Sequence, residues 1–363
     1  MNSFKIKDLE VKLPIIQGGM GIGVSLSGLA STVANEGGIG VIAAVGIGMK
    51  EPDYKKHVEA ANKIALKKEI IKARSKTNGA IGVNILLALT DYDSLVNVAI
   101  EEGVDIVFVG AGLPLQMPAN LEKYNTKFAP KISSPRAAKI IFNHWAEKYN
   151  RVPDAVVVEG SMCGGHVGFK KVDLINRSAR PLIDIAAEVV REIDHFQQKF
   201  GIAIPVIAGG GIYTGSDMYK IMQVGVTAVK MGTRFVTTHE SDVSIDFKQN
   251  YINCKEEDIV IIDSPLGLPG RVIRNAFVDE ILAGKQRPVN CQWRCIKSCD
   301  FRNVPFCIAE ALLNSTKGDF ENGFSFAGSN AYRAKEIISV HETFEQIKQE
   351  YYQEKLFSES KAI

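Results

Sequence analysis

Short hydrophobic runs alternate with longer amphipathic stretches along most of the chain. The runs are rich in β-branched residues and are bounded by glycine or proline, which is typical of strands. Eight runs predict strands, at residues 14–18, 38–44, 80–87, 105–112, 127–133, 155–160, 204–211 and 228–235. Helical spacing of hydrophobic residues predicts helices at 25–37, 134–149, 180–200 and 216–225. Because each strand is continuously apolar, we expect a parallel sheet that is covered on both faces.

The number of strand–helix units decides between two α/β architectures. Eight units in about 235 residues favour a (β/α)₈ TIM barrel over an open, doubly wound sheet. A doubly wound dinucleotide fold usually has G-x-G-x-x-G after its first strand, and "QGGMGIG" at 17–23 matches that spacing poorly. The pattern therefore predicts an α/β fold of the TIM-barrel type.

The chain after the eighth strand follows a different pattern. Residues 239–320 are of mixed character, with a loop-like "SPLGLPGRV" at 264–272, whereas 323–356 reads as helical from about residue 329. A barrel needs a helix after its eighth strand. We therefore expect residues 1–238 and 321–363 to form the barrel, with 239–320 inserted between strand eight and the last helix as a smaller domain.

Composition and charge exclude several classes of partner. The chain is 46% hydrophobic and 23% charged, which is ordinary for a globular protein. Lys and Arg number 43 and Asp and Glu 41, so a net charge of +2 offers no attraction to nucleic acid or to acidic membranes. "MNSFKIKDLE" lacks the apolar core of a signal peptide, and the apolar runs are too short to span a membrane. We expect a cytoplasmic location and leave the oligomeric state open.

A histidine follows two glycines at the end of the sixth predicted strand. "VVVEGSMCGGHVGF" at 156–169 places His166 directly after Gly164 and Gly165. Glycines cost backbone entropy, and a chain accepts that cost where it turns sharply or lies against something flat. A tight turn with a solvated histidine and a binding site for a flat ligand are both consistent with this stretch alone.

The ends of strands seven and eight resemble a phosphate site. TIM barrels build their active sites at the carboxyl ends of the strands, and phosphates are commonly bound after the last two. "AGGGI" and "KMGTR" occupy those ends, and their glycine N–H groups and threonine hydroxyl could cradle a phosphate. The predicted cradle consists of Gly209, Gly210, Gly211, Gly232 and Thr233.

Five motifs in order resemble the nitronate monooxygenase family, formerly called 2-nitropropane dioxygenases, which includes the flavin-dependent enoyl-ACP reductase II. They are "PIIQGGMG", "GVNIL", "VVVEGSMCGGHVGF", "IPVIAGGGI" and "VKMGTRF", and "FAGSNA" follows before the last helix. The resemblance implies a non-covalent FMN at the carboxyl ends of the strands, with His166 as the catalytic residue near its reactive ring. We expect the cofactor to contact the predicted cradle and the other strand ends, at Gly18, Gly19, Met20, Asn84, Glu159, Gly164, Gly165 and Met231.

Two positions depart from the family, and one carboxylate is ambiguous. The family often has Pro where this chain has Gly19, and Ser where it has Gly209. The second change removes a hydroxyl from the phosphate site, so Thr233 and backbone amides would take a larger share. Glu159 could hydrogen-bond the flavin or its ribityl chain, or could be an exposed turn carboxylate.

The resemblance implies an FMN-dependent oxidoreductase, and several reactions fit it. The first is oxidation of an alkyl nitronate by O₂ to a carbonyl compound and nitrite, in which neutral His166 takes a proton from carbon beside a nitro group. Others are NAD(P)H-dependent reduction of an enoyl thioester, with His166 donating a proton, and NAD(P)H-dependent reduction of a quinone. A module that binds FMN or another phosphorylated ligand without turnover is the alternative from another class.

The six cysteines raise the question of a metal. A cytosolic chain keeps cysteines as thiols or metal ligands rather than disulfides. Cys291, Cys295, Cys299 and Cys307 are enough to bind zinc or an iron–sulfur cluster, although their spacing matches no standard ferredoxin run. If 291–299 is helical, three of these thiols share one face. We expect buried thiols and no metal, and no nucleophilic role for Cys163.

Overall fold

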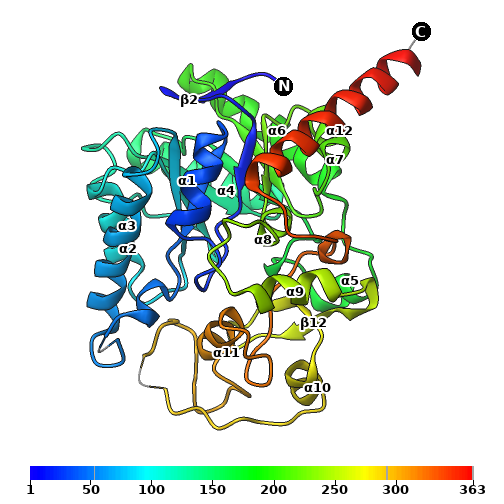
Figure 1. The fold of residues 1–363 in the computed structure, drawn as a ribbon. Coiled ribbons are helices and arrows are strands. Elements are labelled where there is room, and N and C mark those ends of the chain that lie inside the picture. The colour runs from blue at the N-terminus through cyan, green and yellow to red at the C-terminus, as the bar shows by residue number, and fades with distance from the viewer. Residues whose placement is uncertain (53, 292, 362–363) are drawn as a thin grey trace.

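Eight parallel strands close into a barrel in the computed structural model, which describes residues 1–52, 54–291 and 293–361 (Figure 1). The strands follow the chain around the barrel, and the last pairs with the first. They are β3 (Ile15–Gln17), β4 (Ile39–Ala43), β5 (Ala80–Leu86), β6 (Ile106–Gly110), β7 (Lys127–Ile132), β8 (Val156–Glu159), β10 (Val206–Gly209) and β11 (Ala228–Met231). The predicted (β/α)₈ barrel is confirmed, and each of the eight predicted runs contains one of these strands.

Helices cover the outside of the barrel between most pairs of strands. They are α1 (Ser27–Asn35), α2 (Val58–Arg74), α3 (Tyr92–Glu101), α4 (Pro135–Tyr149), α6 (Leu182–Phe200), α7 (Gly215–Met222) and α12 (Val340–Lys361), and a 3-10 turn, η1 (Ile47–Lys50), precedes α2. Residues 111–126, which join β6 to β7 and are all described, form turns without a helix. The buried face of each helix packs on the outward-pointing residues of the strands in one large core.

A second core fills the inside of the barrel. Inward-pointing residues such as Ile16, Phe108 and Val157 lie at its centre. The N-terminal hairpin, β1 (Phe4–Ile6) and β2 (Leu9–Val11), packs Phe4 and Ile6 against them. Because this hairpin closes the end where the strands begin, only the end where they finish is open to a ligand.

Two predicted boundaries are wrong. The eighth strand ends at Met231 rather than 235, because the chain turns at Gly232 into the short helix α8 (Thr233–Val236). The last helix begins at Val340 rather than about 329. Its start is fixed by a reciprocal cap in which Glu342 N donates to Ser339 Oγ (3.0 Å) and Ser339 N donates to a Glu342 carboxylate oxygen (2.7 Å).

The segment expected to form the inserted domain carries its own elements. They are α9 (Ile245–Asn253), η2 (Glu256–Asp258), β12 (Ile259–Asp263), β13 (Pro269–Ile273), α10 (Ala276–Leu282) and α11 (Ile308–Thr316). Figure 1 shows α9, α10, α11 and β12 below the barrel, on the side opposite the N-terminal hairpin. A short strand from the barrel, β9 (Gly165–His166), joins β12 and β13 in one antiparallel sheet. The extent of the domain, 239–320, stays a prediction.

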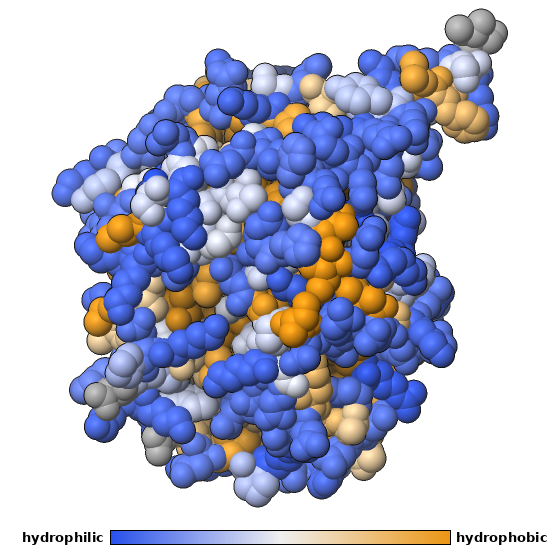
Figure 2. Space-filling model, viewed as in Figure 1, coloured by the Kyte–Doolittle hydropathy of each residue, from blue (hydrophilic) through white to orange (hydrophobic). Residues whose placement is uncertain are grey.

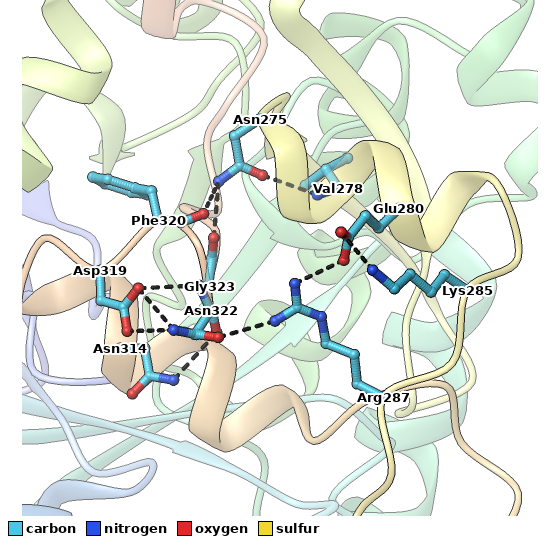
Figure 3. A network of polar contacts seen from close by, with 10 residues as sticks. All are labelled: Asn275, Val278, Glu280, Lys285, Arg287, Asn314, Asp319, Phe320, Asn322 and Gly323. Atoms are coloured by element: carbon cyan, nitrogen blue, oxygen red, sulfur yellow. Dashed lines mark hydrogen bonds and ion pairs between the residues drawn. The ribbon is translucent and has the colours of Figure 1, made fainter.

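Side-chain amides hold the end of this segment together (Figure 3). Asn275 accepts from Val278 N at the start of α10 and donates to the carbonyls of Phe320 and Gly323 (3.2 and 2.8 Å). Arg287 bridges Glu280 and Asn322. These contacts hold in place the stretch of chain that leads from α11 back to the barrel.

The surface is mostly hydrophilic on the face shown in Figure 2. Hydrophobic side chains appear across the middle of that face and near the C-terminal end of the chain, where Leu356 and Phe357 of α12 are 67% and 55% exposed. Of the helices in the described part of the chain, none has the length and apolar character needed to cross a membrane.

The beginning and the end of α12 differ in burial, and this generates a prediction. The side chain of Phe344 is fully buried and packs on Phe235 of α8 at a centroid distance of 5.9 Å. Removing a buried phenyl ring costs transfer free energy and leaves a cavity, so Phe344→Ala should lower the free energy of unfolding by about 3–5 kcal/mol. Denaturant titration followed by circular dichroism measures the loss.

Phe357→Ala is the matched control on the same helix. Its ring is largely in water, so the change should stay within about 0.5 kcal/mol. Equal losses for the two variants would mean that α12 does not hold α8 against the barrel.

Candidate functional site

A large cavity lies at the carboxyl ends of the barrel strands. Its volume is about 460 Å³, within the usual range for small-molecule sites. All fourteen residues predicted for the site border it. They are Gly18, Gly19, Met20, Asn84, Glu159, Gly164, Gly165, His166, Gly209, Gly210, Gly211, Met231, Gly232 and Thr233. The structure brings the predicted set together, while the role of each residue stays a prediction.

Several of the glycines are required by the backbone. Gly210 and Gly211 have φ values of +97° and +90°, and Gly165 has +77°, a region that other residues rarely adopt. A Cβ on Gly164 would lie 2.7 Å from the backbone of Ala327, and one on Gly19 would lie 2.3 Å from Cβ of Asn84. The glycine-rich edge therefore lets separate stretches of backbone meet at the cavity wall.

Residues 327–330 complete this wall from the far end of the chain. Gly328 N donates to Thr233 Oγ1 (3.1 Å), and Ser329 N donates to the Met162 carbonyl (3.1 Å). Asn330 Nδ2 donates to the Gly211 carbonyl (2.8 Å). The "FAGSNA" motif thus lies against both of the strand ends predicted to bind phosphate.

His166 lies at the border of the cavity on β9, which pairs with β13. Its Nε2 is 2.6 Å from Ser264 Oγ, and its ring meets the edge of Phe326 at a centroid distance of 5.0 Å. Burial, together with the positive charge of Lys131, lowers the pKa of His166 to about 4. The imidazole is therefore neutral at pH 7 and able to accept a proton.

Three charged side chains enter the mouth of the barrel from neighbouring strands. Side chains on a strand alternate between its faces, so Lys131, Glu159 and Lys230 share the inward face with Ala129, Val157 and Ala228. Lys131 Nζ pairs with Glu159 at 3.0 Å. Glu159 is thus part of an ion pair at the cavity wall rather than an exposed turn carboxylate.

Cys163 is held in a form unsuited to nucleophilic attack. Burial, followed by the negative charge of Glu159, raises the pKa of its thiol to about 12. Arg271 fixes the loop that carries it by donating to the carbonyls of Ser161 and Cys163 (2.7 and 2.5 Å). A thiol rather than a thiolate is therefore present at neutral pH, and the absence of a nucleophilic role for Cys163 stays a prediction.

Two buried polar atoms at the cavity have no hydrogen-bond partner among the described residues. They are the amide oxygen of Asn84 and the ammonium of Lys230. The pyrimidine edge of a flavin ring offers an N–H donor and carbonyl acceptors, which are the partners that these two atoms lack. With the glycine-rich wall, they make a set that fits a flavin.

Sequence reasoning missed the partners of the site that lie far away in the chain. Ser264 and Arg271 come from the predicted loop at 264–272, and Asn330 comes from a stretch expected to be helical. Lys131 and Lys230 could have been identified as site residues from the sequence, because a charged residue within a strand covered on both faces is unusual.

The four-cysteine cluster borders a second, much smaller cavity of about 20 Å³. All six cysteines are free, and 293–299 form turns and an isolated bridge from Ile296 to Leu89 instead of the helix considered for 291–299. Residue 292 lies outside the described residues. Among the side chains that the structure describes, no group of three or more His, Cys, Asp or Glu is arranged to hold a metal ion. The absence of a bound metal stays a prediction.

Comparisons with known proteins agree with this geometry. The chain is 28% identical over 278 residues to (3aS,4S,5R,7aS)-5-hydroxy-7a-methyl-1-oxo-octahydro-1H-indene-4-carboxyl-CoA dehydrogenase of Mycobacterium tuberculosis, covering 77% of this chain and 68% of that one. It is 27% identical over 308 residues to a probable nitronate monooxygenase of Staphylococcus haemolyticus, covering 77% and 80%. Its fold matches the structure of FabK from Thermotoga maritima with a TM-score of 0.73, at 29% identity and over 97% and 96% of the chains.

A family model covers nearly the whole sequence. The nitronate monooxygenase model matches residues 2–350, which include every strand of the barrel and the segment between β11 and α12. The match supports flavin-dependent oxidoreductase chemistry on small molecules, and the cavity provides the place for it. The chain belongs to the nitronate monooxygenase family.

Proposed function

We propose that this chain is an FMN-dependent nitronate monooxygenase that oxidises alkyl nitronates with O₂ to a carbonyl compound and nitrite. The observation that carries the proposal is His166, a neutral imidazole held at the border of a glycine-walled cavity on a family-typical barrel. The relative from S. haemolyticus, named as a probable nitronate monooxygenase, supports the same reaction.

The cofactor proposed is FMN, and its phosphate would lie against the ends of β10 and β11. The backbone N–H groups of Gly210, Gly211 and Gly232 and the hydroxyl of Thr233 are the candidate donors. Asn84 and Lys230 would meet the ring, because their polar atoms are unpaired at the cavity. A site for one terminal phosphate suits the mononucleotide rather than FAD.

When bound, the flavin supplies two-electron redox chemistry and reaction with O₂. The residues of the chain supply binding and proton transfer. Ser264 engages Nε2 of His166 and so fixes the orientation of the ring. With the hydrogen on Nε2 donated to Ser264 Oγ, Nδ1 would keep its lone pair and be the nitrogen that takes the proton of the substrate. A neutral nitroalkane gives its α-proton to this nitrogen and becomes a nitronate. The apolar Phe326 beside the imidazole keeps water from solvating the ring.

The first test identifies the cofactor. Flavin released from the purified protein by heat should elute as FMN on chromatography, at about one per chain. FAD would contradict the monophosphate site, and a colourless protein that takes up no added FMN would contradict the proposed function as a whole.

The second test removes the base. His166→Ala should lose about 10²–10⁴-fold in kcat/KM on a neutral nitroalkane, the usual contribution of general base catalysis. A preformed nitronate has already lost its proton, so its oxidation should be affected far less. Steady-state oxygen consumption on both substrates measures the difference.

His195→Ala is the matched control, because His195 is exposed on α6 and does not border the cavity. It should leave both rates unchanged. If His166→Ala slows both substrates equally with flavin still bound, His166 orients the substrate instead of taking its proton. Unchanged rates would remove His166 from the mechanism.

A second candidate function is the flavin-linked, NAD(P)H-dependent reduction of an enoyl thioester. The observation that favours it is the relative from M. tuberculosis, which is named for a CoA thioester substrate. The same cavity would then receive a nicotinamide and a thioester in turn, and His166 would have to be reprotonated after each donation. The first function is preferred because the family model and the relative from S. haemolyticus carry the name of that activity.

Anaerobic mixing separates the two candidates. We expect a nitronate to bleach the visible absorbance band of the flavin, at about 450 nm, and NADH and NADPH to leave it unchanged. Dithionite serves as the control that the flavin can be reduced. Rapid bleaching by either nicotinamide would instead favour the thioester or quinone reductase.

A further inference from the structure

Lys230 is the most unusual side chain of the barrel. It lies on β11 between Val229 and Met231, and only 7% of its surface is exposed. Its ammonium has no hydrogen-bond partner among the described residues and lies 3.8 Å above the centre of the Phe108 ring. It borders the large cavity.

The charged groups around Lys230 do not neutralise it. β11 is flanked by β10, which places Gly209 opposite Lys230, and by β3, which places Ile16 there. The charges that face it are Lys131 on β7 and Glu159 on β8, and these two pair with each other. A protonated Lys230 would therefore leave the mouth of the barrel with one uncompensated positive charge.

An unpaired ammonium inside a barrel opposes folding. Burial lowers the pKa of Lys230 well below its ordinary range, and Lys131 lowers it further while Glu159 opposes the shift. Contact with an aromatic face recovers less than the usual cost of burying a charge. The ammonium of Lys230 destabilises the empty barrel, and its presence is explained if an anionic group enters the cavity and pairs with it.

We propose that Lys230 binds the pyrimidine edge of the flavin and stabilises the negative charge that this edge gains on reduction. The inference rests on the proposed flavin cofactor. In that reduction the nitronate and one water would become the carbonyl compound, nitrite, two electrons and two protons. A flavin held at this site would take both electrons and one of these protons, the other proton would go to solvent, and the reduced ring would carry one negative charge over N1 and C2=O. The ammonium of Lys230 then pairs with that charge. If the amine is neutral beforehand, it takes its proton from solvent.

The position of Lys230 favours the ring over the phosphate and the substrate. The candidate phosphate donors at the end of β11 begin at Gly232, where the chain has left the strand, and those after β10 begin at Gly210. Lys230 lies within its strand, opposite Gly209, and points into the barrel below these donors. The substrate must reach His166, and the charge that acts on His166 is Lys131 rather than Lys230. A flat ring bound at the mouth would have Lys230 and Asn84 as polar partners for its edge.

The test measures the reduction potential of the bound flavin in Lys230→Met. Loss of a charge-assisted hydrogen bond to the reduced ring should lower the equilibrium constant for reduction about 10- to 100-fold, or ~30–60 mV for two electrons. Equilibration with a dye of known potential gives the value at pH 7. Flavin content should stay near that of the wild type, because glycine backbone and phosphate contacts hold the oxidised cofactor.

Lys127→Met is the matched control. Lys127 is also a buried lysine of the barrel, at the opposite end of β7, where it pairs with Asp8 at 2.8 Å. Its removal should leave the potential unchanged. A second readout uses flavin-free protein: Lys230→Met should melt at or above the wild-type temperature, because methionine removes an unpaired buried charge.

Each other outcome contradicts the inference in a recognisable way. An unchanged potential with flavin bound would exclude Lys230 as the partner of the reduced ring while leaving the proposed function intact. An unchanged potential with a raised KM for nitronate would assign Lys230 to the substrate anion, and loss of oxidised flavin would assign it to the phosphate. A wild-type protein that binds no flavin would overturn the inference together with the proposed function.

Discussion

The site depends on which inward-facing positions of the barrel carry a side chain. Along each strand every second residue points inward, and in the lower layers these residues are Ile16, Phe108, Val157 and Ile207, which fill the interior. Two residues further along β3 and β10, the same face carries Gly18 and Gly209. The core therefore ends before the strands do, and the space left above it is the cavity of about 460 Å³. The candidate functional residues are arranged around this incompletely filled layer.

The charged residues of the same layer follow from this opening. On β7, β8 and β11 the inward positions at the mouth are Lys131, Glu159 and Lys230. None of them could be tolerated one layer lower, where water and ligand do not reach. The cation of Lys131 also helps to keep His166 neutral, so the ion pair and the candidate base act on each other across the mouth.

The barrel could be predicted from the sequence because each strand corresponds to one short apolar run that is bounded by glycine or proline. The glycine-rich wall of the site could be predicted for the same reason, because each glycine motif lies within one short stretch of sequence. What could not be predicted depends on pairing between distant segments: Ser264 reaches His166 only because β9 joins a sheet with β13, across 98 positions of the chain. The start of α12 was missed although "SVHE" is a capping box, because the preceding residues also have helical composition. In the structure Gly328 N donates to Thr233 and the side-chain amide of Asn330 donates to the Gly211 carbonyl, which holds this stretch against the strand ends.

Through these long-range contacts, the segment between α8 and α12 affects His166 in two ways. It supplies Ser264, which orients the imidazole, and the β13 strand, which fixes the backbone of Gly165 and His166. Arg271 of that strand also holds the carbonyls of Ser161 and Cys163, so the whole loop after β8 is positioned by residues more than 100 places later. The barrel strands therefore provide the floor of the pocket and its charges, whereas residues after β11 complete its wall and the added sheet places the candidate base. Relatives with the same barrel motifs but a different segment after β11 would keep a flavin pocket and differ in how the histidine meets the substrate.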